Sequence, residues 1–136
     1  MGIKNFHWKK TPTGYPDALG GLYLEVQDLA KIGYLMLNNG TWDGQQIISS
    51  EWVKRSVSKH VTFENEGGYG YQWWIPAQDN GQTEIFSGIG YGGQYVFVAP
   101  AYDIVAVFNG WNIHSTPELQ TFRALQDRIL PATQRE

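Results

Sequence analysis

The stretch that decides the fold is SGIGYGGQYVFVAPAYDIVAVFNGW, residues 87–111. It holds two runs rich in β-branched and aromatic residues, QYVFVAP and DIVAVFNGW, which are typical of strands. Only Pro100-Ala101-Tyr102 separates them. A short connection of this kind between two strands predicts an antiparallel hairpin.

Four glycines precede the first of these runs, at positions 88, 90, 92 and 93. Glycine in or beside a strand marks a bend or a place where something approaches the backbone closely. Two interpretations follow from the residues alone. The cluster is a bulge or hairpin turn, or it exposes backbone N–H groups that stabilise an oxyanion.

Helices are predicted on both sides of this stretch. In EVQDLAKIGYLMLNNG, residues 25–40, apolar positions recur with helical spacing and Asn38-Asn39-Gly40 supplies a left-handed stop. SSEWVKRSVSKH, residues 49–60, predicts a second helix with Ser49 or Ser50 as N-cap. A third follows Thr116 as N-cap, and its apolar stripe is Leu119, Phe122, Leu125 and Ile129.

YGYQWWI, residues 69–75, and EIFSG, residues 84–88, predict further strands. The order of elements is therefore two helices, three or four antiparallel strands and one helix. This order predicts an α+β fold, with an antiparallel sheet and flanking helices. We find no internal repeat and no linker, so residues 1–136 are expected to form a single domain.

Composition excludes several classes of protein. Hydrophobic residues make up 42% and charged residues 17%, which predicts a folded chain. The net charge of −3, with scattered Lys and Arg, argues against a nucleic-acid partner. Three distant histidines and no cysteine give no metal-ligand spacing, and we expect no metal and no cofactor. The sequence has neither a membrane span nor a signal peptide at its start, and the compartment stays open.

Three segments together, residues 20–57, 69–75 and 87–112, resemble the C-terminal part of the serine β-lactamase and penicillin-binding-protein superfamily. The nearest branch is the class C-like one of esterases, amidases and D-aminopeptidases. The match runs from about Met1 to Leu130. The resemblance implies the C-terminal portion of the α/β lobe of that fold. It also implies a parent serine hydrolase, of a family often periplasmic or secreted, that cleaves an ester, amide or peptide-like small molecule through an acyl-enzyme.

The resemblance also assigns site residues. Members carry Ser-x-x-Lys, then Tyr-x-Asn or Ser-x-Asn, then Lys-Thr-Gly or a relaxed form of it. The third element falls on Tyr91-Gly92-Gly93, followed by Gln94, whose N–H would be half of an oxyanion hole. Tyr91 stands where stricter members carry Lys or His, and it offers a substrate carboxylate no cation. An ester or small amide substrate is therefore expected.

The other two elements precede this region in the family, and no Tyr-x-Asn or Ser-x-Asn occurs in the chain. We therefore expect residues 1–136 to be a partial domain, the C-terminal segment of a β-lactamase-like hydrolase. It would carry no catalytic nucleophile of its own and be inactive alone.

Two groups of residues in the chain match patterns that supply a catalytic serine. Ser56-Val57-Ser58-Lys59 fits Ser-x-x-Lys, but we expect it at the far end of its helix on a solvated, basic face. The chemistry needs the serine at the start of a buried helix. A Ser-His-Asp triad through Ser87 and His114 is not excluded by their order. No Gly-x-Ser-x-Gly elbow is present, and Ser87 is expected to be an ordinary strand residue.

The resemblance has a consequence for partners. The family sheet also uses strands from the N-terminal segment, so an unpaired edge is expected here. Such an edge is completed by the missing segment or by self-association, including a domain swap. Two alternative functions remain open at this stage: a non-catalytic module that binds carbohydrate through exposed Trp and Tyr, and a stand-alone fragment with a structural or regulatory role.

Overall fold

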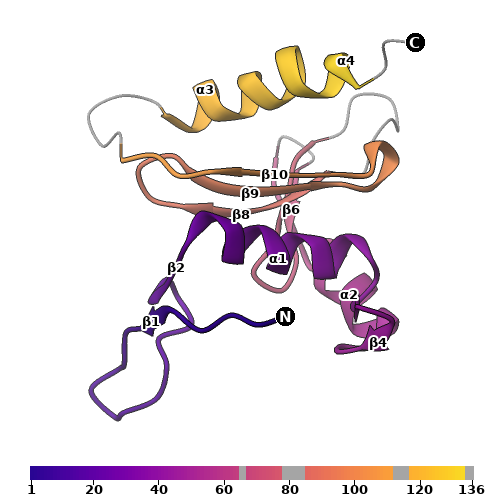
Figure 1. Cartoon of the computed structure of the whole chain (residues 1–136). Helices are drawn as coiled ribbons and strands as arrows, with labels where there is room; N and C mark the ends of the chain where they lie inside the picture. Colours follow the sequence, from indigo (N-terminus) through magenta and orange to yellow (C-terminus); the bar gives the residue numbers. More distant parts are fainter. Residues whose placement is uncertain (65–66, 78–84, 112–116, 134–136) are drawn as a thin grey trace.

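The computed structural model describes residues 1–64, 67–77, 85–111 and 117–133. Three layers are visible in Figure 1. An antiparallel sheet forms the middle layer, the C-terminal helical segment covers one face, and the first two helices cover the other. The α+β class predicted from the sequence is confirmed.

The described main sheet has six strands in the order β10-β9-β8-β7-β6-β5, all antiparallel. Three strands are long and three are only two residues each. Their bounds are β5 Val61–Thr62, β6 Gly68–Tyr69, β7 Trp74–Ile75, β8 Phe86–Gly90, β9 Gln94–Ala99 and β10 Ile104–Phe108.

The predicted hairpin of the deciding stretch is confirmed as β9 and β10. Ala99 pairs with Ile104, and a 3₁₀ turn, η1 (Pro100–Tyr102), connects the strands. Asp103 closes this turn in the left-handed conformation, with φ of 54°. β8 and β9 form a second hairpin, in which Gly90 pairs with Gln94. Tyr91, Gly92 and Gly93 are therefore its three-residue loop.

Helix α1, Val26–Leu37, lies on the sheet with Gly33, Leu35 and Met36 buried. At Gly33 the helix lies close against strands β9 and β10. A β-carbon there would lie 2.6 Å from Val105 Cγ1 and 3.0 Å from Val96 Cγ2. The helix ends at Asn38, and Gly40 follows with φ of 84° and donates its N–H to the Leu35 carbonyl.

Helix α2, Ser50–Ser56, is capped by Ser49, whose hydroxyl accepts the N–H of Trp52 at 3.1 Å. Of the two N-cap candidates, Ser49 is therefore the cap. Between the helices, β3 (Thr41–Trp42) and β4 (Gln45–Gln46) form a small hairpin around a turn at Asp43-Gly44.

The C-terminal segment is helical in three parts: α3 (Pro117–Ala124), a π-helical turn η2 (Leu125–Ile129) and α4 (Leu130–Ala132). Leu125 is fully buried, and Phe122 and Ile129 contact the same core. Thr116 and the Leu119 side chain lie outside the described residues.

Two cores lie on the two faces of the sheet. The core under α3 contains alternate β9 residues, Tyr95, Phe97 and Ala99, with Leu125 and Leu130. The core under α1 contains Val98, Phe86 and Ile75 from the sheet, with Met36 and Val53 from the helices. Alternation along β9 thus supplies both cores, as expected for a strand covered on both sides.

The segment YGYQWWI differs from its predicted single strand. It is two short strands, β6 and β7, around a tight turn in which Gly70 N–H donates to the Trp73 carbonyl at 2.8 Å. Gln72 adopts φ of 67° in that turn, a conformation uncommon outside glycine and asparagine. Trp73 and Trp74 face opposite ways: Trp73 contacts the α1-side core, whereas Trp74 is 41% exposed.

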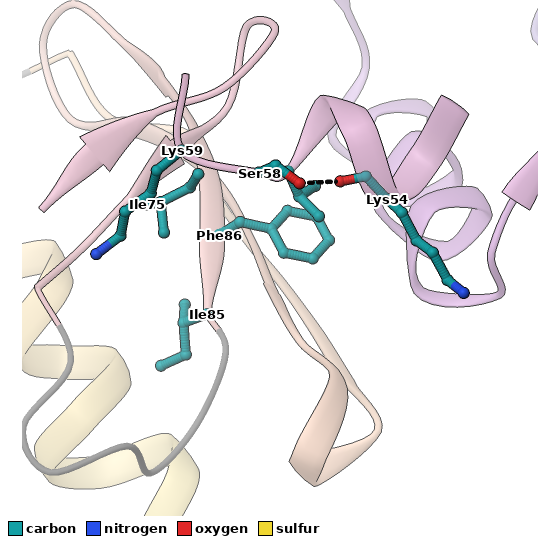
Figure 2. A pocket seen from close by; sticks show the side chains of 7 residues that line it. Lys54, Ser58, Lys59, Ile75, Ile85 and Phe86 are labelled. Carbon is teal, nitrogen blue, oxygen red and sulfur yellow. Dashed lines mark hydrogen bonds between the residues drawn. The ribbon is translucent and has the colours of Figure 1, made fainter. Parts of the chain in front are cut away.

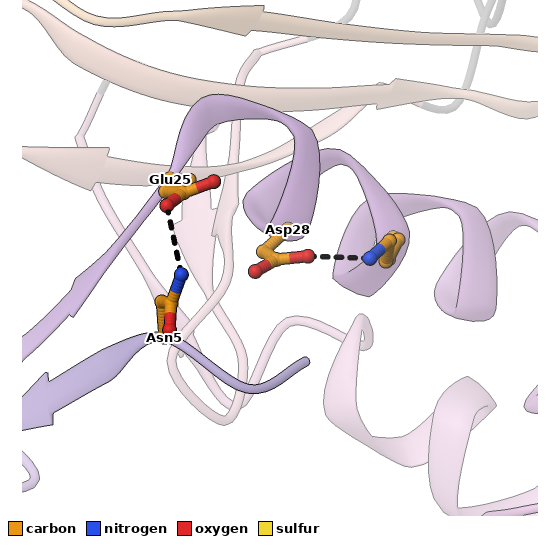
Figure 3. Close-up of polar contacts among 4 residues, drawn as sticks. Asn5, Glu25 and Asp28 are labelled. Atoms are coloured by element: carbon orange, nitrogen blue, oxygen red, sulfur yellow. Dashed lines mark hydrogen bonds and ion pairs between the residues drawn. The ribbon is translucent and has the colours of Figure 1, made fainter. Parts of the chain in front are cut away.

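The N-terminal stretch, which shows no strand period in the sequence, contains a hairpin of β1 (Phe6–Trp8) and β2 (Leu22–Leu24). Figure 3 shows how it joins the core helix: Asn5 donates to Glu25 at 3.4 Å, directly before α1. Within α1, Asp28 is buried and pairs with Lys31. Among the described helices, none combines the length and apolar character needed to cross a bilayer.

Candidate active site

The four residues that the resemblance assigns lie together at one end of the sheet, in the β8–β9 loop and the first position of β9. These residues differ in solvent exposure. Tyr91 is 74% exposed, and Gln94 is partly buried. Gly92 and Gly93 are buried, with φ of 85° and 89°, which an L side chain rarely adopts. The hairpin-turn interpretation of these two glycines is therefore correct for their backbone.

A groove of about 520 Å³ adjoins this loop. Three segments line it: residues 19–29 around β2, the loop side of β8 and β9, and the end of β10 with residues 109 and 111. Ile89, Gly90, Tyr91 and Gln94 reach the groove, whereas Gly92 and Gly93 are not in its wall. The described wall contains no Lys, Arg, His, Asp or Glu side chain.

Backbone N–H groups are available at this loop. Among the hydrogen bonds of the described residues, none uses the N–H of Tyr91, Gly92 or Gly93. Gln94, by contrast, belongs to the β8–β9 ladder opposite Gly90. Tyr91 N–H is thus the donor that combines contact with the groove and freedom from a partner in the described chain.

Neighbouring residues fix the loop from two sides. A β-carbon on Gly110 would lie 3.0 Å from the carbonyl oxygens of both Gly92 and Gly93, so the chain after β10 abuts the loop closely. A β-carbon on Gly90 would lie 2.8 Å from Gln94 Oε1. The Gln94 side chain therefore lies across Gly90, where the groove begins. The sequence offers only the glycines themselves as a signal for these contacts.

The Ser-x-x-Lys match, residues 56–59, lies at the end of α2, beside the turn between β6 and β7. Ser56 is the last residue of α2, and its hydroxyl donates to the Trp52 carbonyl at 2.8 Å. The expectation of a solvated serine is wrong, because Ser56 is 3% exposed. The β6–β7 turn covers it: Tyr71 N–H donates to the Ser56 carbonyl at 2.8 Å.

The second serine of that segment, Ser58, lines a separate pocket of about 580 Å³, whose wall combines Lys54 and Lys59 with apolar side chains. Its hydroxyl donates to the Lys54 carbonyl at 2.7 Å. Figure 2 shows both lysine ammonium groups pointing away from Ser58, so neither is placed to activate it. Ser87 lies on β8, and its proposed triad partner His114 lies outside the described residues.

The exposed rings around Trp52 stack on one another. Trp52 stacks on Tyr71 with ring centroids 5.4 Å apart, and Arg55 lies 5.9 Å from the Trp52 ring. His60 stacks on Tyr71 in turn, at 4.1 Å. The ring faces of this cluster are therefore occupied by one another, whereas Trp111 and Tyr91, each 74% exposed, line the groove.

An antiparallel sheet between helical layers, with a glycine loop beside a groove at one end, is the arrangement expected of a β-lactamase-like hydrolase. The family model described as Beta-lactamase matches residues 3–127. The chain belongs to this family, and this membership does not favour the alternative of a carbohydrate-binding module.

The chain is similar to two curated proteins and to one solved structure. It is 32% identical over 129 residues to the 6-aminohexanoate-dimer hydrolase of Paenarthrobacter ureafaciens, covering 87% of this chain and 31% of that protein. It is 28% identical over 128 residues to an uncharacterized protein of Alkalihalophilus pseudofirmus, covering 86% of this chain and 37% of that protein.

The solved structure is described as "Putative 6-aminohexanoate-dimer hydrolase from Bacillus anthracis". It superposes with a TM-score of 0.73 and 26% identity, over 92% of this chain and 33% of that one. The chain therefore spans about a third of the length of these proteins.

Proposed function

We propose that residues 1–136 are the C-terminal segment of a serine hydrolase domain that cleaves an ester or small amide through an acyl-enzyme. In this proposal the β8–β9 loop supplies one backbone donor of the oxyanion hole, and the groove holds the substrate. The observation that carries it is the loop itself: free N–H groups at Tyr91–Gly93, beside a groove of substrate size.

The sequence resemblance assigned Gln94 N–H to this role. Because Gln94 is paired in the ladder and Tyr91 is not, we assign the donor within the Tyr91–Gln94 segment to Tyr91 N–H. A preorganised donor of this kind stabilises the charge that develops on the carbonyl oxygen, and removing one lowers kcat by about 10²–10³. The uncharged groove wall supports a neutral ester or amide over a carboxylate-bearing substrate.

A chimera tests the assignment. Residues 3–127 replace the matching region of the Paenarthrobacter enzyme, and hydrolysis of 6-aminohexanoate dimer and of a p-nitrophenyl ester is measured. Tyr91→Pro removes the N–H, whereas the matched control Tyr91→Ala keeps it. We expect the proline variant alone to lose about 10²–10³ in kcat. Equal rates for the two variants, with equal circular dichroism spectra, would refute the role of Tyr91 N–H.

We further propose that this chain alone has no acylating nucleophile. Ser56, the serine in the Ser-x-x-Lys match, uses its hydroxyl within its own helix, and Ser58 does so toward the Lys54 carbonyl. Exposure of the full chain to a fluorophosphonate should give no covalent adduct by intact mass. Stoichiometric labelling of any serine would overturn this part of the proposal.

The partner of this segment is proposed from the sheet edge. β10 has one neighbour, β9, in the described sheet, so its other edge is open there. Unpaired edges of this length template a further strand. We propose that a segment of the same hydrolase, or a second copy of this chain, pairs with β10. Light scattering at micromolar concentration should show a multimer for the chain alone, and a clean monomer would count against self-pairing.

A further inference from the structure

Two large rings on the candidate active-site groove have no partner of their own. Tyr91 and Trp111 line the groove, and each side chain is 74% exposed. Within the described residues neither ring stacks on another ring or on a cation, in contrast to the cluster around Trp52. Exposed aromatic side chains gathered on a concave surface are typical of sites that bind a small molecule.

A backbone contact places the two rings on the same groove. A β-carbon on Gly110 would lie 3.0 Å from the carbonyl oxygens of Gly92 and Gly93. Tyr91 directly precedes the first of these two glycines, and Trp111 directly follows Gly110. The β8–β9 loop and the chain after β10 therefore carry one ring each, and their close approach brings both rings to one end of the groove wall.

The polar side chains of the described wall are uncharged. Gln94 and Asn109 contribute side-chain amides, and neither amide has a hydrogen-bond partner among the described residues. An amide both donates and accepts, so it can bind the ester or amide group of a ligand. The rest of the wall is mainly apolar, with Leu22, Leu29 and Val107 among its residues. A sugar would leave several hydroxyls without a partner against such a wall, which is unfavourable, whereas a flat apolar ring would not.

We propose that the groove selects a neutral substrate with an aromatic ring beside its scissile carbonyl, held against the rings of Tyr91 and Trp111. The Gln94 amide then binds a polar group of the same substrate. This inference rests on the proposed hydrolase function, because it names the substrate class of that groove. Contacts between aromatic rings add about two- to tenfold in affinity beyond the burial of the same area. They form in the ground state and in the transition state alike, so they lower KM and leave kcat unchanged.

Binding is tested first, without turnover. The probes are phenylacetamide and cyclohexylacetamide, which share the amide and differ in whether the ring is aromatic. Each is titrated into the full ¹⁵N-labelled chain, and the indole N–H signal of Trp111 is followed. Trp52 is the control, because it lies in a separate stack with Tyr71. We expect a saturable shift of Trp111 only, with phenylacetamide binding about two- to tenfold more tightly than cyclohexylacetamide.

Substitutions assign this preference to the two rings. Tyr91→Leu combined with Trp111→Leu keeps apolar side chains in the wall and removes both rings. The affinity ratio of the two probes, followed at the side-chain amide signals of Gln94, should then fall to about one. Trp52→Leu removes a ring outside the groove and should leave the ratio unchanged. Circular dichroism checks that the variants are folded.

The chimera described above separates this inference from the proposed function. Its hydrolysis of methyl phenylacetate and of methyl cyclohexylacetate is measured, and KM should be about two- to tenfold lower for the aromatic ester. A folded chimera that cleaves neither ester overturns the proposed function, and the affinity ratio in the chain still decides the aromatic preference.

Four results would overturn the aromatic preference. They are the absence of a saturable Trp111 shift in the wild-type chain, an affinity ratio of about one there, a ratio that survives the loss of both rings, and equal KM values for the two esters. A sugar is the competing neutral ligand. If methyl β-glucoside shifts the Trp111 signal at lower concentration than phenylacetamide does, the proposed substrate class is wrong.

Discussion

Replacing Gly33 by alanine measures how closely α1 lies on the sheet. Alanine in a helix is more favourable than glycine by about 1 kcal/mol. At this position, however, the added methyl would lie 2.6 Å from Val105 Cγ1. The obstructing groups belong to β-branched residues on strands, whose χ1 is restricted. Overpacking of this kind costs about 1–3 kcal/mol. With a severe contact and stiff neighbours we expect the upper end, a net loss of about 2 kcal/mol in the free energy of unfolding.

The reasoning is tested by a double-mutant cycle with Val105→Ala, followed by urea unfolding of the four chains. Val105→Ala removes the nearer obstacle, and the remaining contact with Val96 at 3.0 Å needs only a small shift. Gly33→Ala should then be neutral or stabilising, so the coupling energy should be about 2–3 kcal/mol. Strict additivity, or a wild-type background in which Gly33→Ala stabilises, would refute the close approach of helix and sheet.

Three further predictions concern the effect of single substitutions on stability. Ser49→Ala should lose about 1 kcal/mol of stability through its N-cap bond, with Ser50→Ala near neutral as the matched control; equal losses in chemical denaturation would contradict the cap. Gly40→Ala should lower the free energy of unfolding by at least about 2 kcal/mol, because the added β-carbon would lie 2.1 Å from the Ile48 carbonyl oxygen and the backbone there has positive φ. A thermal unfolding midpoint within a degree of wild type would contradict this. Ser87→Ala should leave stability unchanged or raise it, because the Ser87 hydroxyl has no hydrogen-bond partner in the described structure. Ser56→Ala should lower stability by about 1 kcal/mol, because the Ser56 hydroxyl donates to the Trp52 carbonyl. Calorimetry in which Ser87→Ala is the more damaging of the two would contradict the structure.

Local patterns were sufficient for the long elements. Helix α1 follows from its apolar spacing, and the β9–β10 hairpin follows from two β-prone runs with a short connection between them. The glycine cluster also indicated the position of the candidate site from local sequence. Residues 92 and 93 form the loop there, with φ values that favour glycine.

The short elements could not be predicted from their own residues. The turn between β6 and β7 places Gln72 at positive φ without a glycine or asparagine to indicate it. A carbonyl of α2 explains this turn, because Gly70 lies so close to Ser56 O that a β-carbon there would be 2.0 Å away. That contact is long-range. The lack of a partner for the Ser87 hydroxyl cannot be read from the sequence either, because it depends on what the two neighbouring strands, β7 and β9, and the helical layer place around it.

The burial of β9 on both faces has a consequence for the motions of the molecule. Five of its six residues are buried, whereas both residues of β5, at the far edge of the sheet, are exposed. Opening free energies vary across a protein, and they are lowest where few apolar contacts hold the backbone. Amide hydrogen exchange should therefore be slowest in β9 and fastest toward β5, with β7 between them. The Tyr91–Gly93 loop joins β8 to β9, so local unfolding of β5 to β7 leaves the candidate active-site loop on the folded part of the sheet.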